Sequence, residues 1–299
     1  MSDSTLAKEL RAAFPTLPLL ENEPMAARCS FRIGGPAEVF AEPESEKTLC
    51  ALWRWLRAHD VPMTVVGNGT NLLVHDEGVR GVVLHLGEAF SEVRRDGERL
   101  YAGAGVTLAH LATVAKDEGL AGLEFAHGIP GSLGGAIVMN AGAYGGEMRD
   151  VVTSVCYLNK NGEIGETWEP GFAYRHSRFA ARGELVLGAR FRLTPDDPAA
   201  IHARMMELWA KRSASQPLDK PSAGSTFKRP ATGYAAAMIE QAGLKGFTIG
   251  GAQVSEKHAG FVINTGSATF ADVTALMAHI QKTVLETSGV HLEPEVRII

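Results

Sequence analysis

Apolar residues recur every three or four positions in several stretches of the chain, which is the spacing of one face of an α-helix. The clearest is residues 45–58, where three leucines share one face behind Ser45, a residue typical of a helix N-cap. In residues 269–288, Thr269 and Asp272 resemble a capping box. Further helices are predicted from Thr107, from Asp197 with Pro198 in the first helical position, and near Tyr234 to Ala242.

Shorter apolar runs between glycine, proline or asparagine residues predict strands. Residues 63–74 have the pattern of a strand, a glycine turn and a second strand. Residues 152–167 predict a hairpin with a type I′ turn at Asn161-Gly162. Residues 30–43 predict two short strands around a Gly-Gly turn. Further strands are expected at 81–86, 98–106 and 184–193, whereas the weakly patterned segment up to Pro24 predicts an N-terminal arm.

The mixture of helices and strands indicates the α+β class. A chain of 299 residues favours two or three domains. The Pro195–Pro198 segment, which holds two prolines and two aspartates, marks a boundary. We expect three units, residues 1–86, 87–195 and 196–299.

Composition excludes several classes of function. Hydrophobic residues make up 45% of the chain and the formal charge is −5, with no cluster of basic residues typical of a nucleic-acid surface. No apolar run has membrane-spanning length, and the start lacks a signal-peptide pattern. Cys29, Cys50 and Cys156 are widely spaced, so we expect buried thiols in a reducing, cytoplasmic compartment. The histidine spacing predicts no metal site.

The segment Val65–Leu72 runs from a strand into a glycine turn. Consecutive N–H groups in such a turn form a concavity for anionic oxygens, and Thr70 and Asn71 can add side-chain donors. Leu72 stands where GxGxxG requires its third glycine, which argues against a Rossmann turn. An ordinary tight turn is the alternative interpretation.

A longer glycine-rich stretch spans residues 128–146 and carries few charges. Ordering so many glycines costs conformational entropy, which binding of a ligand can offset. A large, flat ligand with a pyrophosphate and a ring would suit such a backbone. A purely structural loop is the alternative.

The segment Pro221–Lys228 places Ser225 among small residues, three positions before Lys228. This serine fits a nucleophile, a proton donor, a phosphate contact or a capped turn. The segment is not a GxSxG elbow, which disfavours a hydrolase. Arg175 and Glu295 are isolated charges, and out of context such residues belong to the surface.

Seven segments together, in order from about Phe31 to the C-terminus, resemble landmarks of the UDP-N-acetylenolpyruvoylglucosamine reductase (MurB) family. They are FRIGGPA, VVGNGTNLL, GLEFAHGIPGSLGGAIVMNAGAYGGE, FAYRHSRF, PSAGSTFKRP, IEQAGLKGFTIGGAQVSEKHAGFVIN and LEPEVRII.

The resemblance implies a two-part FAD cradle of the vanillyl-alcohol-oxidase (PCMH) type, followed by a C-terminal α/β substrate domain. It implies non-covalent FAD, NADPH as reductant, a nucleotide-sugar substrate and neither nucleic acid nor a membrane span; we favour a monomer. The implied FAD contacts are Gly67, Asn68, Gly69, Thr70, Asn71, Leu72, Ile129, Pro130, Gly131, Ser132, Gly134, Gly135, Asn140, Ala141, Gly142 and Ala143.

The implied reaction converts UDP-N-acetylglucosamine enolpyruvate into UDP-N-acetylmuramate for the bacterial cell wall. A hydride reaches C3 of the enolpyruvyl group, and the negative charge formed at C2 is shared with the carboxylate. By position, Arg175 and Glu295 would stabilise that charge and Ser225 would protonate C2. Four residues are expected to contact the nucleotide sugar: Tyr144, Arg212, Lys228 and Gln253.

The sequence departs from the family pattern in two places. Thr70 replaces a serine but keeps the hydroxyl group. Residues 185–217 are too few to hold the tyrosine-bearing insertion of one subtype, so the chain resembles the shorter subtype. The alternatives are another flavin oxidase of the same cradle fold and a non-catalytic nucleotide-sugar binding module. A Rossmann dehydrogenase ranks third.

Overall fold

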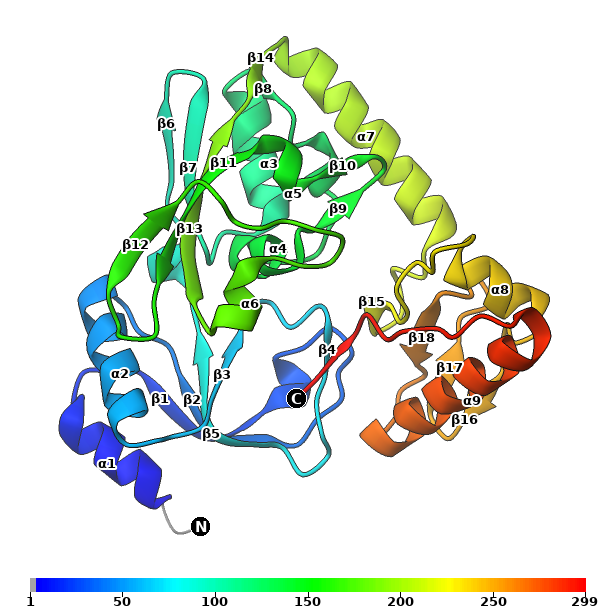
Figure 1. Cartoon of the computed structure of the whole chain (residues 1–299), viewed down its shortest axis with the longest axis horizontal. Helices are drawn as coiled ribbons and strands as arrows, with labels where there is room; N and C mark the ends of the chain where they lie inside the picture. The colour runs from blue at the N-terminus through cyan, green and yellow to red at the C-terminus, as the bar shows by residue number, and fades with distance from the viewer. Residues whose placement is uncertain (1–3) are drawn as a thin grey trace. The chain divides into compact units, whose positions relative to one another are not determined.

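The computed structural model describes residues 4–299 (Figure 1). Its contacts divide the chain into two compact units. The first unit contains the described residues up to Glu21, Val39–Asn68 and Gly81–Arg212, and the second contains Asn22–Glu38, Gly69–Arg80 and Ser213–Ile299. The units interleave along the chain, whereas the sequence predicted three continuous ranges, 1–86, 87–195 and 196–299; that division stays a prediction.

A four-stranded sheet of order β1-β2-β5-β3 contains the first strands of the chain. Its strands are β1 Leu19–Pro24, β2 Pro36–Ala41, β3 Met63–Val66 and β5 Val79–His85, and β3 pairs parallel with β5. Helix α2, Glu46–Ala58, begins as predicted, because the Ser45 side chain accepts a hydrogen bond from the Thr48 N–H.

Two predictions for the N-terminal region are wrong. The expected arm contains helix α1, Thr5–Ala13, and strand β1, because Ala7 and Leu10 join the core cluster of buried residues. Residues 30–33 form no strand, so only β2 remains of the two strands predicted there. Neither error affects the α+β class.

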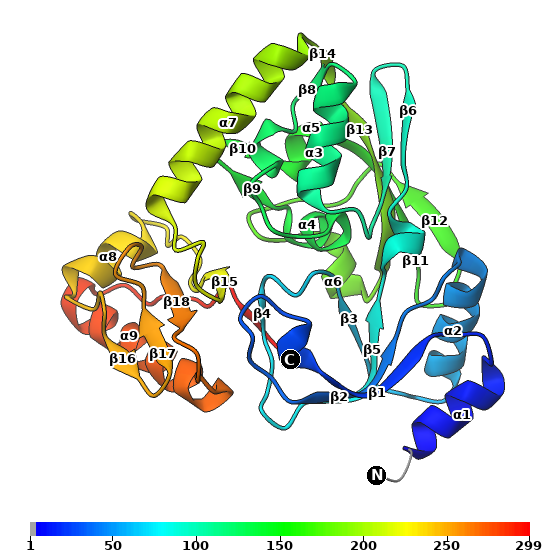
Figure 2. The same ribbon diagram turned by 180° about the vertical axis from the view of Figure 1, so that it is seen from behind.

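A five-stranded antiparallel sheet of order β12-β11-β13-β7-β6 forms the centre of the first unit (Figure 2). Its strands are β6 Val93–Asp96, β7 Arg99–Gly103, β11 Val152–Leu158, β12 Ile164–Thr167 and β13 Leu185–Arg192. Helices α3, Leu108–Asp117, and α4, Leu133–Met139, lie on one face of this sheet in both views. Charged side chains such as Arg99 and Arg192 are exposed on the sheet.

The β11–β12 hairpin forms, but its predicted turn type is wrong. A type I′ turn needs positive φ at both central residues, and only Gly162 has it, at 75°. The Asn159 side chain accepts hydrogen bonds from the N–H groups of Asn161 and Glu163. These bonds favour a longer loop that ends in a left-handed glycine.

Short helices and strands lie between the longer elements of the first unit. They are η2 Glu88–Phe90, β8 Leu120–Ala121, η3 Glu124–Ala126, β9 Gly142–Ala143, β10 Gly146–Glu147, α5 Met148–Val151, α6 Arg178–Arg182 and β14 Thr194–Pro195. A short helix of the second unit, η1, spans Met25–Ala27. Helix α7, Pro198–Ser215, begins as predicted, with the Asp197 carboxylate accepting from the Ala199 N–H.

The second unit contains an antiparallel sheet of order β15-β18-β17-β16. Its strands are β15 Ser222–Ser225, β16 Thr248–Ile249, β17 Ala252–Val254 and β18 Phe261–Asn264. Helix α8 spans Ala235–Gln241, and helix α9 spans Phe270–Ser288 with the predicted capping box. Strand β4, Leu72–Leu73, pairs parallel with the C-terminal strand β19, Arg297–Ile298.

Candidate functional site

The two glycine-rich segments meet in the first unit. A Cβ atom added to Gly67 would lie 2.1 Å from Ser132 Oγ, so a larger residue at position 67 would collide with the second segment. Ser132 is itself buried at the start of α4. In the same segment, the Gly134 N–H donates to the Ala104 carbonyl (2.8 Å), which fixes the loop against the end of β7.

Backbone donors in the first glycine segment are available to a ligand. Within residues 4–299, the N–H groups of Asn68, Gly69 and Thr70 donate to no protein acceptor. Gly69 has a φ of 62°, and a Cβ there would lie 2.2 Å from the Arg28 carbonyl oxygen, so glycine is required. Consecutive free N–H groups of this kind suit the oxygens of a pyrophosphate.

Asn140 organises the end of α4. It ends the helix in the left-handed region at φ 43°, and its Oδ1 accepts from the Arg149 N–H (2.9 Å). Its Nδ2 donates to the Glu147 carboxylate (3.0 Å) and to the Ala173 carbonyl (3.1 Å). One buried side chain therefore joins the second glycine segment to the turn that carries Arg175.

Arg175 lies in a tight turn. The Ala173 and His176 backbones exchange two hydrogen bonds, of 3.0 and 3.1 Å, around Tyr174 and Arg175. Next to this turn, buried Ser177 donates its hydroxyl to the Val138 carbonyl (2.8 Å) in α4. The guanidinium carbon of Arg175 lies 5.0 Å from the centre of the Tyr174 ring.

Three non-glycine residues here have unusual backbone conformations. Asn140, Tyr144 and Arg175 have φ values of 43°, 53° and 53°. A non-glycine residue with positive φ costs about 1–2 kcal/mol and persists only where its surroundings impose it. Such strain is concentrated at ligand-binding and catalytic sites, which supports a functional role for this loop cluster.

Tyr144 and Arg212, two of the expected substrate contacts, lie together in the first unit. Burial lowers the pKa of Arg212, and the neighbouring Tyr144 opposes that effect through its charge and through a hydrogen bond. The Arg212 stem packs on the second glycine segment, since a Cβ on Gly128 would lie 3.1 Å from its Cδ and Nε.

The sequence reasoning missed two aromatic side chains beside this pair. The rings of His127 and Trp209 meet edge to face, with centroids 6.3 Å apart. Burial, followed by the charges of His202 and Lys116, lowers the pKa of His127. Trp209 stands one helical turn before Arg212 on α7, and that spacing could have suggested it.

In the second unit, Ser225 and the Glu295 segment lie side by side. Ser225 ends strand β15, opposite Phe261. The neighbouring Thr226 carbonyl accepts from the Glu295 N–H (2.8 Å). Asn71 donates its side-chain amide to the Glu295 carbonyl (3.2 Å), which links the first glycine segment to the C-terminal segment.

Lys228 and Gln253 have local partners in the second unit. Lys228 Nζ lies 3.1 Å from the Glu293 carboxylate. The Gln253 amide donates to the Gly246 carbonyl (3.3 Å) and to Thr248 Oγ1 (3.2 Å) near β16. Their roles toward a nucleotide sugar stay predictions.

Comparisons with known proteins identify the family and the fold. Residues 216–299 match the model of the UDP-N-acetylenolpyruvoylglucosamine reductase C-terminal domain, and residues 37–167 match an FAD binding domain. A reductase of that name from Agathobacter rectalis is 48% identical over 99% of both chains. One from Caldanaerobacter subterraneus is 51% identical over 93% of this chain and 92% of that protein.

The chain belongs to the UDP-N-acetylenolpyruvoylglucosamine reductase family. The crystal structure of the Thermus caldophilus reductase (MurB) agrees with a TM-score of 0.82 and 34% identity, covering 94% of this chain and 98% of that one. The α+β class, the FAD-dependent oxidoreductase class and the family resemblance are thereby confirmed.

The residues present fit FAD. The family model for FAD binding covers Gly67 to Leu72 and Ile129 to Ala143, and the free N–H groups at residues 68–70 suit a pyrophosphate. Gly135 adds an open surface, because a Cβ there would meet only Ser132 Oγ, at 3.8 Å. Among the described residues we find no His, Cys, Asp and Glu cluster for a metal, and no helix there could cross a membrane.

Proposed function

We propose that this reductase takes its electrons from NADPH and reduces the enolpyruvyl group of UDP-N-acetylglucosamine enolpyruvate, with Arg175, Ser225 and Glu295 as its catalytic residues. The observation that carries the proposal is the pairing of Ser225 with the Glu295 segment through the Thr226 carbonyl. Bound FAD supplies hydride transfer, which protein side chains cannot perform.

Arg175 and Glu295 would stabilise the developing negative charge. Reduction at C3 of the enolpyruvyl group places charge on C2 and on the adjacent carboxylate. The Arg175 guanidinium is suited to that carboxylate because it is planar and permanently charged. Its strained turn, held by Asn140 and Ser177, supports a preorganised position.

Ser225 would donate a proton to C2. A serine hydroxyl is a weak acid, but a carbanion at hydrogen-bond distance is a strong base. Ser225 is half-buried and its strand is held on both sides, by Phe261 and through Thr226. This support favours a fixed hydroxyl position.

The nucleotide part of the substrate would contact Tyr144, Arg212, Lys228 and Gln253. The Tyr144–Arg212 hydrogen bond supports joint action of those two residues on the pyrophosphate or sugar. The three unpaired cysteines, two of them buried, support a reducing compartment, and we place the reaction in the cytoplasm. We also favour a monomer.

An anaerobic spectrum tests the reaction. The purified protein should be yellow, should bleach on addition of NADPH, and should regain its colour only when UDP-N-acetylglucosamine enolpyruvate is added. Bleaching by NADH but not by NADPH would contradict the choice of reductant. A colour that returns with unrelated enol ethers but not with this sugar would contradict the choice of substrate.

A further inference from the structure

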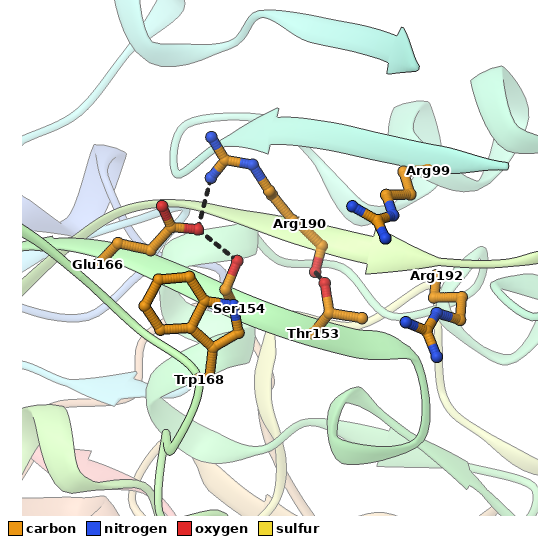
Figure 3. Close-up of a pocket in the computed structure, with 7 residues that line it drawn as sticks. All are labelled: Arg99, Thr153, Ser154, Glu166, Trp168, Arg190 and Arg192. Atoms are coloured by element: carbon orange, nitrogen blue, oxygen red, sulfur yellow. Dashed lines mark hydrogen bonds and ion pairs between the residues drawn. The ribbon is translucent and has the colours of Figure 1, made fainter. Parts of the chain in front are cut away.

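A pocket on the five-stranded sheet has no part in the site described above. It is lined by Arg99, Thr153, Ser154, Glu166, Trp168, Arg190 and Arg192, and its volume is about 270 Å³ (Figure 3). The lining side chains carry three positive charges and one negative charge. The pocket therefore has a net positive charge that suits an anion.

Arg99 and Arg192 supply the unbalanced charge. They face each other directly in the register between β7 and β13, and both are exposed. Within residues 4–299, neither guanidinium forms an ion pair or a side-chain hydrogen bond. Like charges directly opposite on neighbouring strands destabilise a sheet, so a bound anion would relieve this repulsion.

The other half of the pocket is neutral and fixed. Glu166 accepts hydrogen bonds from Arg190 Nη1 and from Ser154 Oγ, both at 2.6 Å. Ser154 is fully buried beneath them, and Thr153 donates its hydroxyl to the Arg190 carbonyl (3.1 Å). The opposite charges of Glu166 and Arg190 balance each other. Arg99 and Arg192 therefore supply the positive charge that is available to a ligand.

Trp168 adds a flat apolar surface. It is 70% exposed, directly after β12, although an indole of this size is usually well buried. Figure 3 shows the indole beside Ser154 and Glu166, with Arg99 and Arg192 on the other side of Thr153. A ring and an anionic group on one small molecule could use both ends of the pocket.

We propose that this pocket binds a mononucleotide, with its phosphate between Arg99 and Arg192 and its base against Trp168. Arginine pairs bind phosphate through several charge-assisted hydrogen bonds, and bases stack on exposed aromatic rings. The volume lies just below the range of about 300–1,000 Å³ for small-molecule sites, which favours a mononucleotide over a dinucleotide. The proposal does not depend on the function proposed above.

Fluorine NMR of the FAD-loaded protein labelled with 5-fluorotryptophan tests this directly. The chain has four tryptophans, and the Trp168→Phe variant identifies the resonance of Trp168. Titration with AMP should move that resonance saturably. Arg99→Gln and Arg192→Gln should each weaken binding by about tenfold or more, the effect expected for a lost charged hydrogen bond.

Lys160→Gln is the matched control, because Lys160 is an exposed cation at the far end of the β11–β12 hairpin. It should leave AMP binding unchanged. A Trp168 resonance that AMP does not move, or equal weakening by Lys160→Gln, would overturn the site. If phosphate alone or adenosine alone binds as well as AMP, the assignment to a mononucleotide is overturned.

Discussion

Single residues with unfavourable backbone conformations fix the loop cluster around the end of α4 in the first unit. Asn140, Tyr144 and Arg175 all have positive φ, and a side chain at Gly67 would displace the Ser132 hydroxyl. These costs are local, and under the proposed function their benefit is a fixed position for the ligand. Substitutions of single residues should therefore change ligand binding or reaction rate more than they change the free energy of unfolding.

The Ser225→Ala variant tests proton donation. Reduction of the flavin by NADPH should stay nearly intact, while reduction of the enolpyruvyl sugar should slow by about 10²–10⁴-fold, the contribution of a positioned acid. Stopped-flow absorbance measures the two half-reactions separately. Ser222→Ala, on the same strand β15, should change neither; equal slowing of both half-reactions by Ser225→Ala would show a structural role instead.

The Gly67→Ala variant tests contact between the two glycine segments. Its methyl group would lie 2.1 Å from Ser132 Oγ, so we expect FAD to be lost during gel filtration. The double variant Gly67→Ala/Ser132→Ala removes the collision, because only Ser132 Oγ lies within 3 Å of the added methyl group, and should retain more FAD than Gly67→Ala. Ser132→Ala alone measures any contribution of the hydroxyl to FAD binding. If the double variant releases as much FAD as Gly67→Ala, the steric explanation is wrong.

At the scale of elements, the end of α4 connects the second glycine segment to the turn that carries Arg175. Asn140 bonds to Arg149, Glu147 and Ala173, and Ser177 bonds to the same helix through Val138. The helix itself has only seven residues and little stability of its own. Its position must come from these tertiary bonds and from packing on the sheet.

Two variants of Asn140 separate its backbone and side-chain roles. Asn140→Gly keeps the left-handed conformation but loses three hydrogen bonds, whereas Asn140→Ala also adds a strain of about 1–2 kcal/mol. Both should raise KM for the sugar by disordering the Arg175 turn. Urea unfolding should show Asn140→Ala to be the less stable of the two; the reverse order would contradict the strain argument.

At the scale of the whole molecule, segments far apart in sequence fold as one unit. The second unit combines residues 22–38, 69–80 and 213–299. Its C-terminal strand β19 pairs with β4, and the His75 N–H donates to the Ile299 carbonyl (2.8 Å). The chain must therefore bring its C-terminal residues back to β4 before this unit is complete.

Deletion of residues 297–299 tests that closure. It removes the pairing of β19 with β4 and the backbone hydrogen bonds from the N–H groups of Arg297, Ile299 and His75, each contributing a net stabilisation of about 1 kcal/mol. We expect a lower urea midpoint and loss of sugar reduction, since Glu295 lies beside the deleted strand. Ile298→Ala keeps the backbone bonds and should have little effect; equal damage from that variant would contradict a main-chain role.

Local signals in the sequence determined most of the elements. Ser45, Thr269 and Asp197 marked helix starts because capping depends only on nearby backbone groups. Seven motifs in order identified the family, and that resemblance implied the cofactor, whereas the glycine-rich segments by themselves left a structural loop as an alternative. The prediction of a type I′ turn at Asn161-Gly162 was wrong because the side chain of Asn159, two residues earlier, accepts hydrogen bonds from N–H groups of the loop.

Only the tertiary structure decided which residues meet. Gly67 touches Ser132, Asn140 holds the Arg175 turn, and Glu295 lies beside Thr226. The opposition of Arg99 and Arg192 likewise depends on strand register. None of these contacts leaves a local signal, because each joins residues that are distant in the sequence and is fixed by sheet register and core packing.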